Sequence, residues 1–586
     1  MCAVIIAMVA TSAHTNLTEA IKLYAYMALL VVAGLGIIKR IPSTASWSLP
    51  GRFAVAWLLG VAMNSIVFFM IRSRPIPDFV SVWIAAGIGA VLLARRVSWR
   101  VTKPKDGMLV VAVILFFVCA LVTADNIYYS ADGVYVMDSN HPTYEMHIAS
   151  SLDTMYPVED YAYLGKDIRY HFAYPIIAQQ LTHSFGQDTM LLIYRSIPLW
   201  MIALFIILIY EISRAMRGAW RRTLFMCLML FSTLSVPIRE LFIAMQKLIG
   251  ISLPVVQDSP AILYRLTFMG SYGLGILYVV ALFLAIRIKK RSLILETIIL
   301  TGMALAKVPF FIACCFAYAG YSLMIWIRGR DFAAALRNGL VLAPGALSFL
   351  LFSSGAHKHN LWILFPAWLN LKSTTLSRSL LLPNASLSGI VYILLFIGIG
   401  AFFLWPTMKT AFKHAGKKRG DPLLLPILII LSSMALILTL TEATESNSIQ
   451  FVYPGYIFLC LLTYPFLLFK KGKTWPTILV LALIVNAGLL VGVQYLSSAN
   501  KTYAPVDDPR NALANAKITM VRATLGPSMS SLSYSADGCY FPDDLLNGLG
   551  YLSLLPEGNV VFSRMYEPCE NSAEVRWRAA SFIRSA

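Results

Sequence analysis

Long apolar runs recur along almost the whole chain and restrict its folds more than any other feature of the sequence. Each has about fifteen to twenty residues, close to the ~20 that an α-helix needs to cross ~30 Å of hydrocarbon. Backbone groups in lipid must pair with one another, and the runs lack strict alternation, so helices rather than barrel strands are expected. With 58% hydrophobic and 13% charged residues, the sequence predicts a polytopic α-helical membrane protein.

We predict about fourteen transmembrane helices, separated by short loops and three longer polar segments. The expected spans are 22–38, 52–71, 78–94, 108–124, 190–210, 223–236, 271–288, 293–306, 309–327, 337–353, 386–406, 422–440, 455–469 and 476–494.

The basic residues indicate the orientation of these spans. More than half of the 48 Lys and Arg residues lie in loops on the same side of every alternation, which the positive-inside rule assigns to the cytoplasm. The net charge of +19 therefore reflects topology rather than a nucleic-acid partner. The longer segments 125–189, 354–385 and 495–586 are then expected on the outer face of a cytoplasmic membrane, joined by 237–270 and 441–454.

The pattern of apolar spans and polar segments divides the chain into N-terminal helices (1–107), a transmembrane core (108–494) and an outer C-terminal domain (495–586). The last part is soluble in composition, and short runs such as 559–563 favour a small α+β domain. Cys539 and Cys569 lie in it on the oxidising side, where a disulfide could form. No metal-binding cysteine pattern is present in the sequence.

The segment 125–189 holds two dense groups of polar residues between apolar spans. Residues 139–154 and 174–181 are expected to form amphipathic helices on the outer leaflet, with Pro142 in a first turn. In a helix, His141 and Glu145 share a face, while His147 points elsewhere. Segments 129–138 and 534–543 resemble each other in sequence. In the first of them, Asp132 and Asp138 could offer carboxylates to Mg²⁺, Mn²⁺ or Ca²⁺. Two unrelated surface turns would produce the same similarity.

These outer segments contain the groups that transfer from a lipid phosphate to a sugar hydroxyl requires. A carboxylate must take the acceptor's proton, and cations must stabilise the departing phosphate. The candidates are Glu145, Asp138 and His147 for catalysis, Lys307, Arg265, Arg169, Tyr170 and His171 for the donor phosphate, and His141, Glu442 and Glu445 for the acceptor. Each of these residues also has a purely structural interpretation, as a solvated loop position, an interfacial anchor, a snorkelling side chain or part of an ordinary turn.

The run Tyr144-Glu-Met-His147-Ile-Ala-Ser-Ser-Leu152, followed by Tyr156-Pro157, Gly165 and Ile168-Arg-Tyr170-His171-Phe172, resembles one family over about fifty residues. It is similar to the first outer loop of bacterial GT-C-type glycosyltransferases that use polyprenyl-phosphate sugars. The resemblance implies a catalytic base in this loop and donor-phosphate binding by Tyr170, His171 and Lys307. Here the acid stands two residues before the histidine instead of three, so either Glu145 or Asp138 could be the base.

We therefore expect an inverting membrane glycosyltransferase that moves a sugar from a polyprenyl-phosphate donor to an envelope glycan or lipid. A secondary transporter or flippase of lipid-linked glycans is one alternative, although such proteins usually carry charges within their spans. An O-antigen-type polymerase or ligase is a nearer alternative, because Arg239, Lys247 and Arg265 also place basic groups in outer segments.

Overall fold

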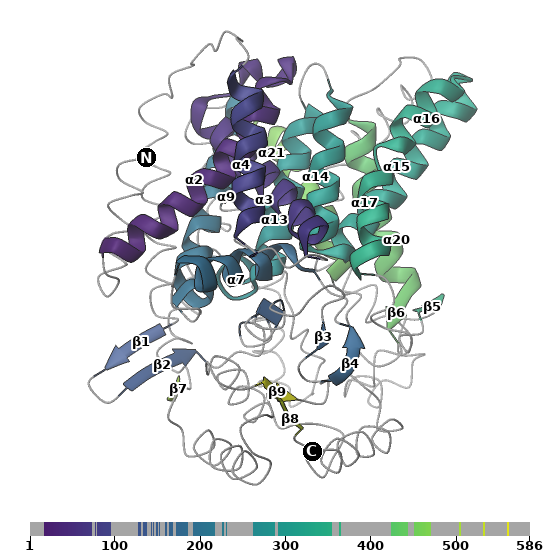
Figure 1. Ribbon diagram of the computed structural model, residues 1–586. Helices are drawn as coiled ribbons and strands as arrows, with labels where there is room; N and C mark the ends of the chain where they lie inside the picture. Colours follow the sequence, from purple (N-terminus) through teal and green to yellow (C-terminus); the bar gives the residue numbers. More distant parts are fainter. Residues whose placement is uncertain are drawn as a thin grey trace.

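The computed structural model is a bundle of apolar helices with small paired strands gathered at one end (Figure 1). It describes residues 17–72, 77, 79–94, 127–130, 133–137, 142, 145, 148–149, 152, 159–160, 163–167, 171–185, 191–216, 226–227, 230, 262–287, 291–353, 362–364, 423–442, 450–469, 503–505, 531–533 and 559–561.

Thirteen described α-helices form or adjoin the bundle, and three short irregular helices interrupt it. The α-helices are α2 (Leu17–Lys39), α3 (Leu49–Ile71), α4 (Val80–Ala94), α7 (Ala173–Phe185), α9 (Ile197–Ala215), α12 (Ile262–Phe268), α13 (Gly270–Arg287), α14 (Leu293–Ala306), α15 (Val308–Gly329), α16 (Phe332–Leu340), α17 (Ala343–Ser348), α20 (Leu424–Thr439) and α21 (Val452–Phe469). The others are the 3₁₀ helix η1 (Pro42–Ser46) and the π-helices η2 (Leu192–Ser196) and η3 (Phe349–Ser353).

Helices long and apolar enough to cross a membrane confirm the expected class of fold. Six reach this length within the described part of the chain, and four shorter apolar helices accompany them, each on a predicted span. The predicted spans 108–124, 386–406 and 476–494 lie outside the described residues, as does most of 223–236. The total of fourteen therefore stays a prediction.

One predicted span, 337–353, differs in detail from the observed helices. The helical segment begins earlier, at Phe332, and is interrupted at 341–342 between α16 and α17. Pro344 follows this interruption, and a proline cannot donate the backbone hydrogen bond that a continuous helix requires.

The strands pair segments that the predicted topology places on the outer side of the membrane. In the three-stranded sheet, β1 (Ile127–Ser130) pairs with β2 (Gly133–Met137), and β2 pairs with β7 (Tyr503–Pro505), all antiparallel. This sheet joins the segment 125–189 to the C-terminal part, as expected if both lie at the same end of the bundle. The other pairs are β3 (Glu159–Asp160) with β4 (Tyr163–Asp167), β5 (Trp362–Leu364) with β6 (Leu440–Glu442), and the parallel β8 (Ser531–Ser533) with β9 (Asn559–Val561).

A separate C-terminal α+β domain stays a prediction. Of residues 495–586, the structure describes the three short strands β7, β8 and β9, and β9 falls within the run predicted to be strand-like. Cys539 and Cys569 lie outside the described residues.

Helices α2, α3 and α4 form a tightly packed N-terminal unit. A Cβ atom at Gly34 would lie 1.8 Å from the carbonyl oxygen of Ala56, and one at Gly60 would lie 1.8 Å from that of Leu30. Only glycine allows backbones to approach so closely, and small residues serve the same purpose in other transmembrane helix pairs.

This unit also holds α7, which lies across the lower end of the bundle (Figure 1). The Gln180 side-chain oxygen accepts hydrogen bonds from Tyr26 and Asn64 at 2.8 and 2.9 Å, and its amide nitrogen donates to Ser81 at 2.6 Å. Ser81 in turn donates to Asn64 at 2.7 Å, so the polar groups are paired although all four side chains are buried. The amphipathic helix predicted on the leaflet is therefore docked against protein.

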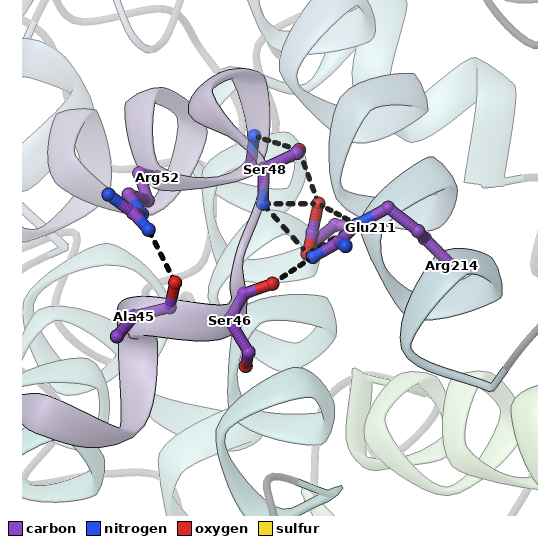
Figure 2. Close-up of polar contacts among 7 residues, drawn as sticks. Ala45, Ser46, Ser48, Arg52, Glu211 and Arg214 are labelled. Atoms are coloured by element: carbon purple, nitrogen blue, oxygen red, sulfur yellow. Dashed lines mark hydrogen bonds and ion pairs between the residues drawn. The ribbon is translucent and has the colours of Figure 1, made fainter. Parts of the chain in front are cut away.

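The opposite end of the bundle is basic and contains its own buried carboxylate. Figure 2 shows Glu211 of α9 against the first turn of α3, where the Ser48 hydroxyl donates to Oε2 at 2.5 Å and the Ser48 backbone nitrogen to Oε1 at 3.2 Å. Arg214 forms an ion pair with Glu211 at 2.5 Å and also donates to the carbonyl of Ser46. These contacts anchor α3 to α9 with every carboxylate oxygen paired.

Candidate functional site

Glu145 lies in a short helical stretch of the segment 125–189 and is buried. Pro142, Glu145 and Ile148 are all helical and turned towards protein, and Leu152 follows on the same face. Ile148 and Leu152 belong to the apolar face that the spacing predicts, and Glu145 shares their burial with only 3% of its surface exposed. It is therefore not a solvated loop residue.

The Glu145 carboxylate is held on one side only. Its Oε1 accepts a hydrogen bond of 2.8 Å from the backbone nitrogen of Ser271, in the first turn of α13, where such donors lack a partner within the helix. Its Oε2 is buried without a hydrogen-bond partner. A carboxylate fixed through one oxygen leaves the second available to take a proton.

The close packing around Ser271 explains this geometry. A Cβ atom at Gly270 would lie 2.1 Å from the Tyr174 ring, so glycine lets α7 and α13 approach at this point. Tyr174 is itself buried, and its hydroxyl donates to the carbonyl of Ile193 at 3.4 Å.

Burial raises the pKa of Glu145 from its ordinary value of 4.5 to about 7, since the ionised form loses its water. The hydrogen bond from the Ser271 backbone and the positive charge of Lys307 act in the opposite direction and limit this rise. A carboxyl group outside the spanning helices with a pKa near neutrality can both accept and release a proton under physiological conditions.

Lys307 forms the break between α14 and α15, at the Glu145 end of the bundle. Its backbone is extended, with φ −159° and ψ 97°, because α15 starts anew with Pro309 in its first turn. The side chain is only 3% exposed, and its Nζ lies 3.6 Å from the centre of the Tyr272 ring. A lysine that snorkelled would instead reach the surface.

Arg265, on α12, places a second cation against the same ring. Its Cζ lies 4.9 Å from the Tyr272 ring centre, and its Nε donates a 2.6 Å hydrogen bond to the Tyr453 hydroxyl of α21. The Tyr272 and Tyr453 rings meet edge-on with centroids 5.8 Å apart. Lys307 and Arg265 therefore share the Tyr272 ring as a common contact.

Lys307 and Arg265 are buried at the same end of the bundle as Glu145. Glu145 is the one carboxylate whose charge acts on Lys307 within the described part of the chain. The ion pairs described elsewhere, Glu211 with Arg214 and Arg291 with Glu296, involve other residues. Buried basic side chains at such a site favour an anionic ligand.

His171 joins the end of the segment 125–189 to the Lys307 turn. The backbone nitrogen of Val308, immediately after Lys307, donates to His171 Nδ1 at 3.5 Å. The structure thus brings together four of the predicted site residues, Glu145, Lys307, Arg265 and His171, from segments far apart in the sequence.

The other predicted site residues are not brought into this group by the described structure. Glu442 ends β6, where its backbone pairs opposite Trp362 in β5. No group of three or more potential metal ligands is found among the described residues. Asp132, Asp138, His141, His147, Arg169, Tyr170 and Glu445 lie outside the described residues.

Ser271, Tyr272 and Tyr453 were not predicted from the sequence. Ser271 and Tyr272 stand at the start of a predicted span, where polar residues are ordinary, and Tyr453 precedes another. The Ser271–Tyr272 pair shortly after Arg265 is the one signal in the sequence that could have identified any of these residues. Comparisons with known protein families and with curated proteins give no match for this chain.

Proposed function

We propose that this protein is an inverting membrane glycosyltransferase that uses a polyprenyl-phosphate sugar, with Glu145 as the general base. The observation that carries the proposal is the buried Glu145 carboxylate, fixed through Oε1 and without a partner at Oε2, near two buried cations. Similarity of the segment 144–172 to the outer loop of GT-C-type enzymes supports the same function.

The reaction assigns a role to each group. Glu145 Oε2 takes the proton of an acceptor hydroxyl, whose oxygen forms a bond to the anomeric carbon from the face opposite the phosphate. The bond from that carbon to the phosphate oxygen breaks, and the lipid phosphate leaves with the electron pair. Inversion follows from this single displacement.

Lys307 and Arg265 would stabilise the departing phosphate, since its charge becomes more negative as the bond breaks. Both side chains contact the Tyr272 ring, which fixes their positions. His171, whose Nδ1 accepts from the backbone nitrogen of Val308 directly after Lys307, would orient the phosphate or a sugar hydroxyl. Because these groups are buried, water does not screen their charges.

The acceptor would be an envelope glycan or lipid, and the site would face the outside of the cytoplasmic membrane. The basic end of the bundle, which carries Arg214, Arg291 and Arg328, lies opposite the Glu145 end and supports this orientation.

The decisive experiment replaces Glu145 by glutamine, which keeps the shape of the side chain and its hydrogen-bond acceptor. We expect transfer from a panel of polyprenyl-phosphate sugars to fall by at least a hundredfold, as for loss of a general base, while the protein still inserts into the membrane. Asp331→Asn, at the first turn of α16, is the matched control, because asparagine also caps helices.

Full activity of Glu145→Gln together with loss of activity in Asp138→Asn would move the base to Asp138. Full activity of both variants would exclude the proposed mechanism. Uptake of lipid-linked glycan without release of lipid phosphate would instead favour a transporter.

A further inference from the structure

The end of α3 nearest Glu145 carries a buried arginine. Arg72 is the C-cap residue of this helix and is 8% exposed, although arginine is rarely buried unless its donors are paired. Its Nη2 donates a hydrogen bond to the backbone carbonyl of Leu152, and its Cζ lies 5.5 Å from the centre of the Phe68 ring. A side chain from the N-terminal helices therefore reaches the segment 125–189.

Leu152 closes the last turn of the helical stretch that contains Glu145. Its backbone nitrogen donates to the carbonyl of Ile148 at 3.1 Å, so the chain is helical up to this position. The last carbonyls of a helix have no partner within it, and the helix dipole makes this end negative. The Arg72 guanidinium pairs one of these carbonyls and opposes the dipole, so it caps the stretch.

Apolar contacts hold the same stretch against α3. Ile148 and Leu152 are fully buried and form one cluster with two phenylalanines at the end of α3. Glu145 stands three residues before Ile148, and residues at this spacing lie on the same side of a helix. The carboxylate is therefore fixed from two directions: α3 holds the stretch that carries it, and the Ser271 backbone of α13 holds its Oε1.

The helix that carries Arg72 belongs to the tightly packed unit of α2, α3 and α4. The resemblance to GT-C-type enzymes covers 144–172 and gives this unit no role. The unit contacts the chain before His171, where Arg72 binds the carbonyl of Leu152. It also contacts the chain after His171, where its polar side chains bind Gln180 of α7. One closely packed unit thus holds the proposed site segment at both ends.

We propose that the unit of α2, α3 and α4 supports the proposed catalytic segment, and that Arg72 is the positioning residue through which it fixes Glu145. This inference rests on the proposed function and deepens it. Arg72 acts through the Leu152 carbonyl rather than on a reacting atom, so it is not a catalytic residue. If Arg72 only stabilised the fold, its loss would lower the amount of folded protein and leave the rate constant of the folded protein unchanged.

Titration of Glu145 reports whether the stretch has moved. The groups that face its carboxyl are Ser271 of α13, Tyr174 of α7 and Lys307. Within the described part of the chain, Lys307 is the one whose positive charge acts on it. Loss of the Arg72 charge alone should therefore leave the pKa of Glu145 unchanged. Release of the stretch should lower this pKa from about 7 towards 4.5, because the carboxyl regains water.

Arg72→Gln removes the charged donor and keeps a polar side chain. We expect kcat with a polyprenyl-phosphate sugar to fall at least about tenfold, because the base is displaced from the acceptor. KM for the donor should change less than about threefold, since Lys307 and Arg265 are untouched. The midpoint of the pH profile should move to lower pH. Arg72→Lys retains a cationic donor and should restore kcat to within about threefold of the wild type.

Arg52, at the other end of α3, provides the matched control. It is 4% exposed, and its Nη2 donates to the carbonyl of Ala45 at 2.6 Å, as Figure 2 shows. Arg52→Gln removes the same kind of contact from the same helix, so it should leave kcat and the pH midpoint at their wild-type values. Equal loss of kcat in Arg52→Gln and Arg72→Gln, or wild-type kcat and midpoint in Arg72→Gln, would overturn the proposal.

Hydrogen exchange tests the same contact without sugar transfer. Mass spectrometry of the full-length protein in nanodiscs follows the peptide that contains 142–152. Its exchange should be at least about tenfold faster in Arg72→Gln, as expected for loss of a hydrogen bond from a charged donor, and unchanged in Arg52→Gln. If Arg72→Gln does not fold, Phe68→Leu takes its place, because it removes the ring beside the guanidinium; about threefold faster exchange is then expected.

The exchange measurement separates this proposal from the proposed function. Wild-type exchange in the variant that folds would overturn the support of the segment, whether or not sugar is transferred. Faster exchange, together with no sugar transfer by the wild type, would uphold that support and refute the glycosyltransferase.

Discussion

The hydrogen bond from Ser271 to Glu145 should control the pH at which the protein is active. If Glu145 is the base, activity requires its ionised form and should rise with pH through a midpoint near 7, the pKa that burial produces. Ser271→Pro removes the backbone donor together with the hydroxyl, and the first turn of a helix tolerates proline.

The size of the shift in the activity midpoint follows from the strength of the hydrogen bond that is lost. A hydrogen bond from a backbone N–H to a buried carboxylate stabilises the ionised form by about 1.5–3 kcal/mol. Because each 1.36 kcal/mol corresponds to about one pH unit, the midpoint should move to higher pH by about one to two units. The shift is upward, since losing the donor makes ionisation of Glu145 less favourable.

The assay measures initial rates of lipid-phosphate release from pH 5.5 to 9.5, a range of about four units that covers both midpoints. Ser271→Ala is the matched control: it loses the hydroxyl but retains the backbone donor, so its midpoint should shift less than that of Ser271→Pro. If the midpoint of Ser271→Pro coincides with that of the wild type, Glu145 is not the titrating base.

Two further substitutions test the packing around the site and at the basic end. Gly270→Ala should reduce transfer at least about tenfold, because the added carbon would meet the Tyr174 ring and displace the first turn of α13. Gly87→Ala, where no atom lies within 4 Å, is its control; equal activity of both variants would contradict this reasoning. Glu211→Ala should lower the free energy of unfolding in detergent by about 3–5 kcal/mol, since it leaves a buried polar group and an arginine unpaired. Asp331→Ala, which removes only a helix cap, should cost about 1 kcal/mol, and a similar loss in both would refute the anchor.

The helices and the position of Lys307 could be predicted from the sequence, because both depend on local patterns. The ends of the apolar runs predict the ends of the observed helices to within a few residues. The sequence around Lys307 predicts a break, since the cation interrupts two apolar runs and Pro309 starts the second helix. Burial of Ile148 and Leu152 likewise follows from their helical spacing.

Contacts between distant segments could not be predicted. Ser271 and Tyr453 are ordinary polar residues near the ends of spans until the fold places them beside Glu145 and Arg265. The docking of α7 against protein could not be predicted for a related reason: an amphipathic pattern does not distinguish a polar face in water from one paired inside protein. Gln180 is polar by sequence, yet Asn64 and its neighbours satisfy it in the core.

Helix α13 determines the distance between the proposed base and the cations. Ser271 holds Glu145 through the backbone, and the next residue, Tyr272, holds Lys307 and Arg265 through its ring. The free N–H of Ser271 points out of the N-terminal end of α13, whereas the Tyr272 ring projects from its side, so one turn holds the carboxylate and the cations at different places. Every residue from 270 to 286 is buried, so α13 is packed on all sides and cannot shift freely. If these residues act as proposed, the reacting groups are positioned before a substrate binds, and binding energy is not needed to assemble them.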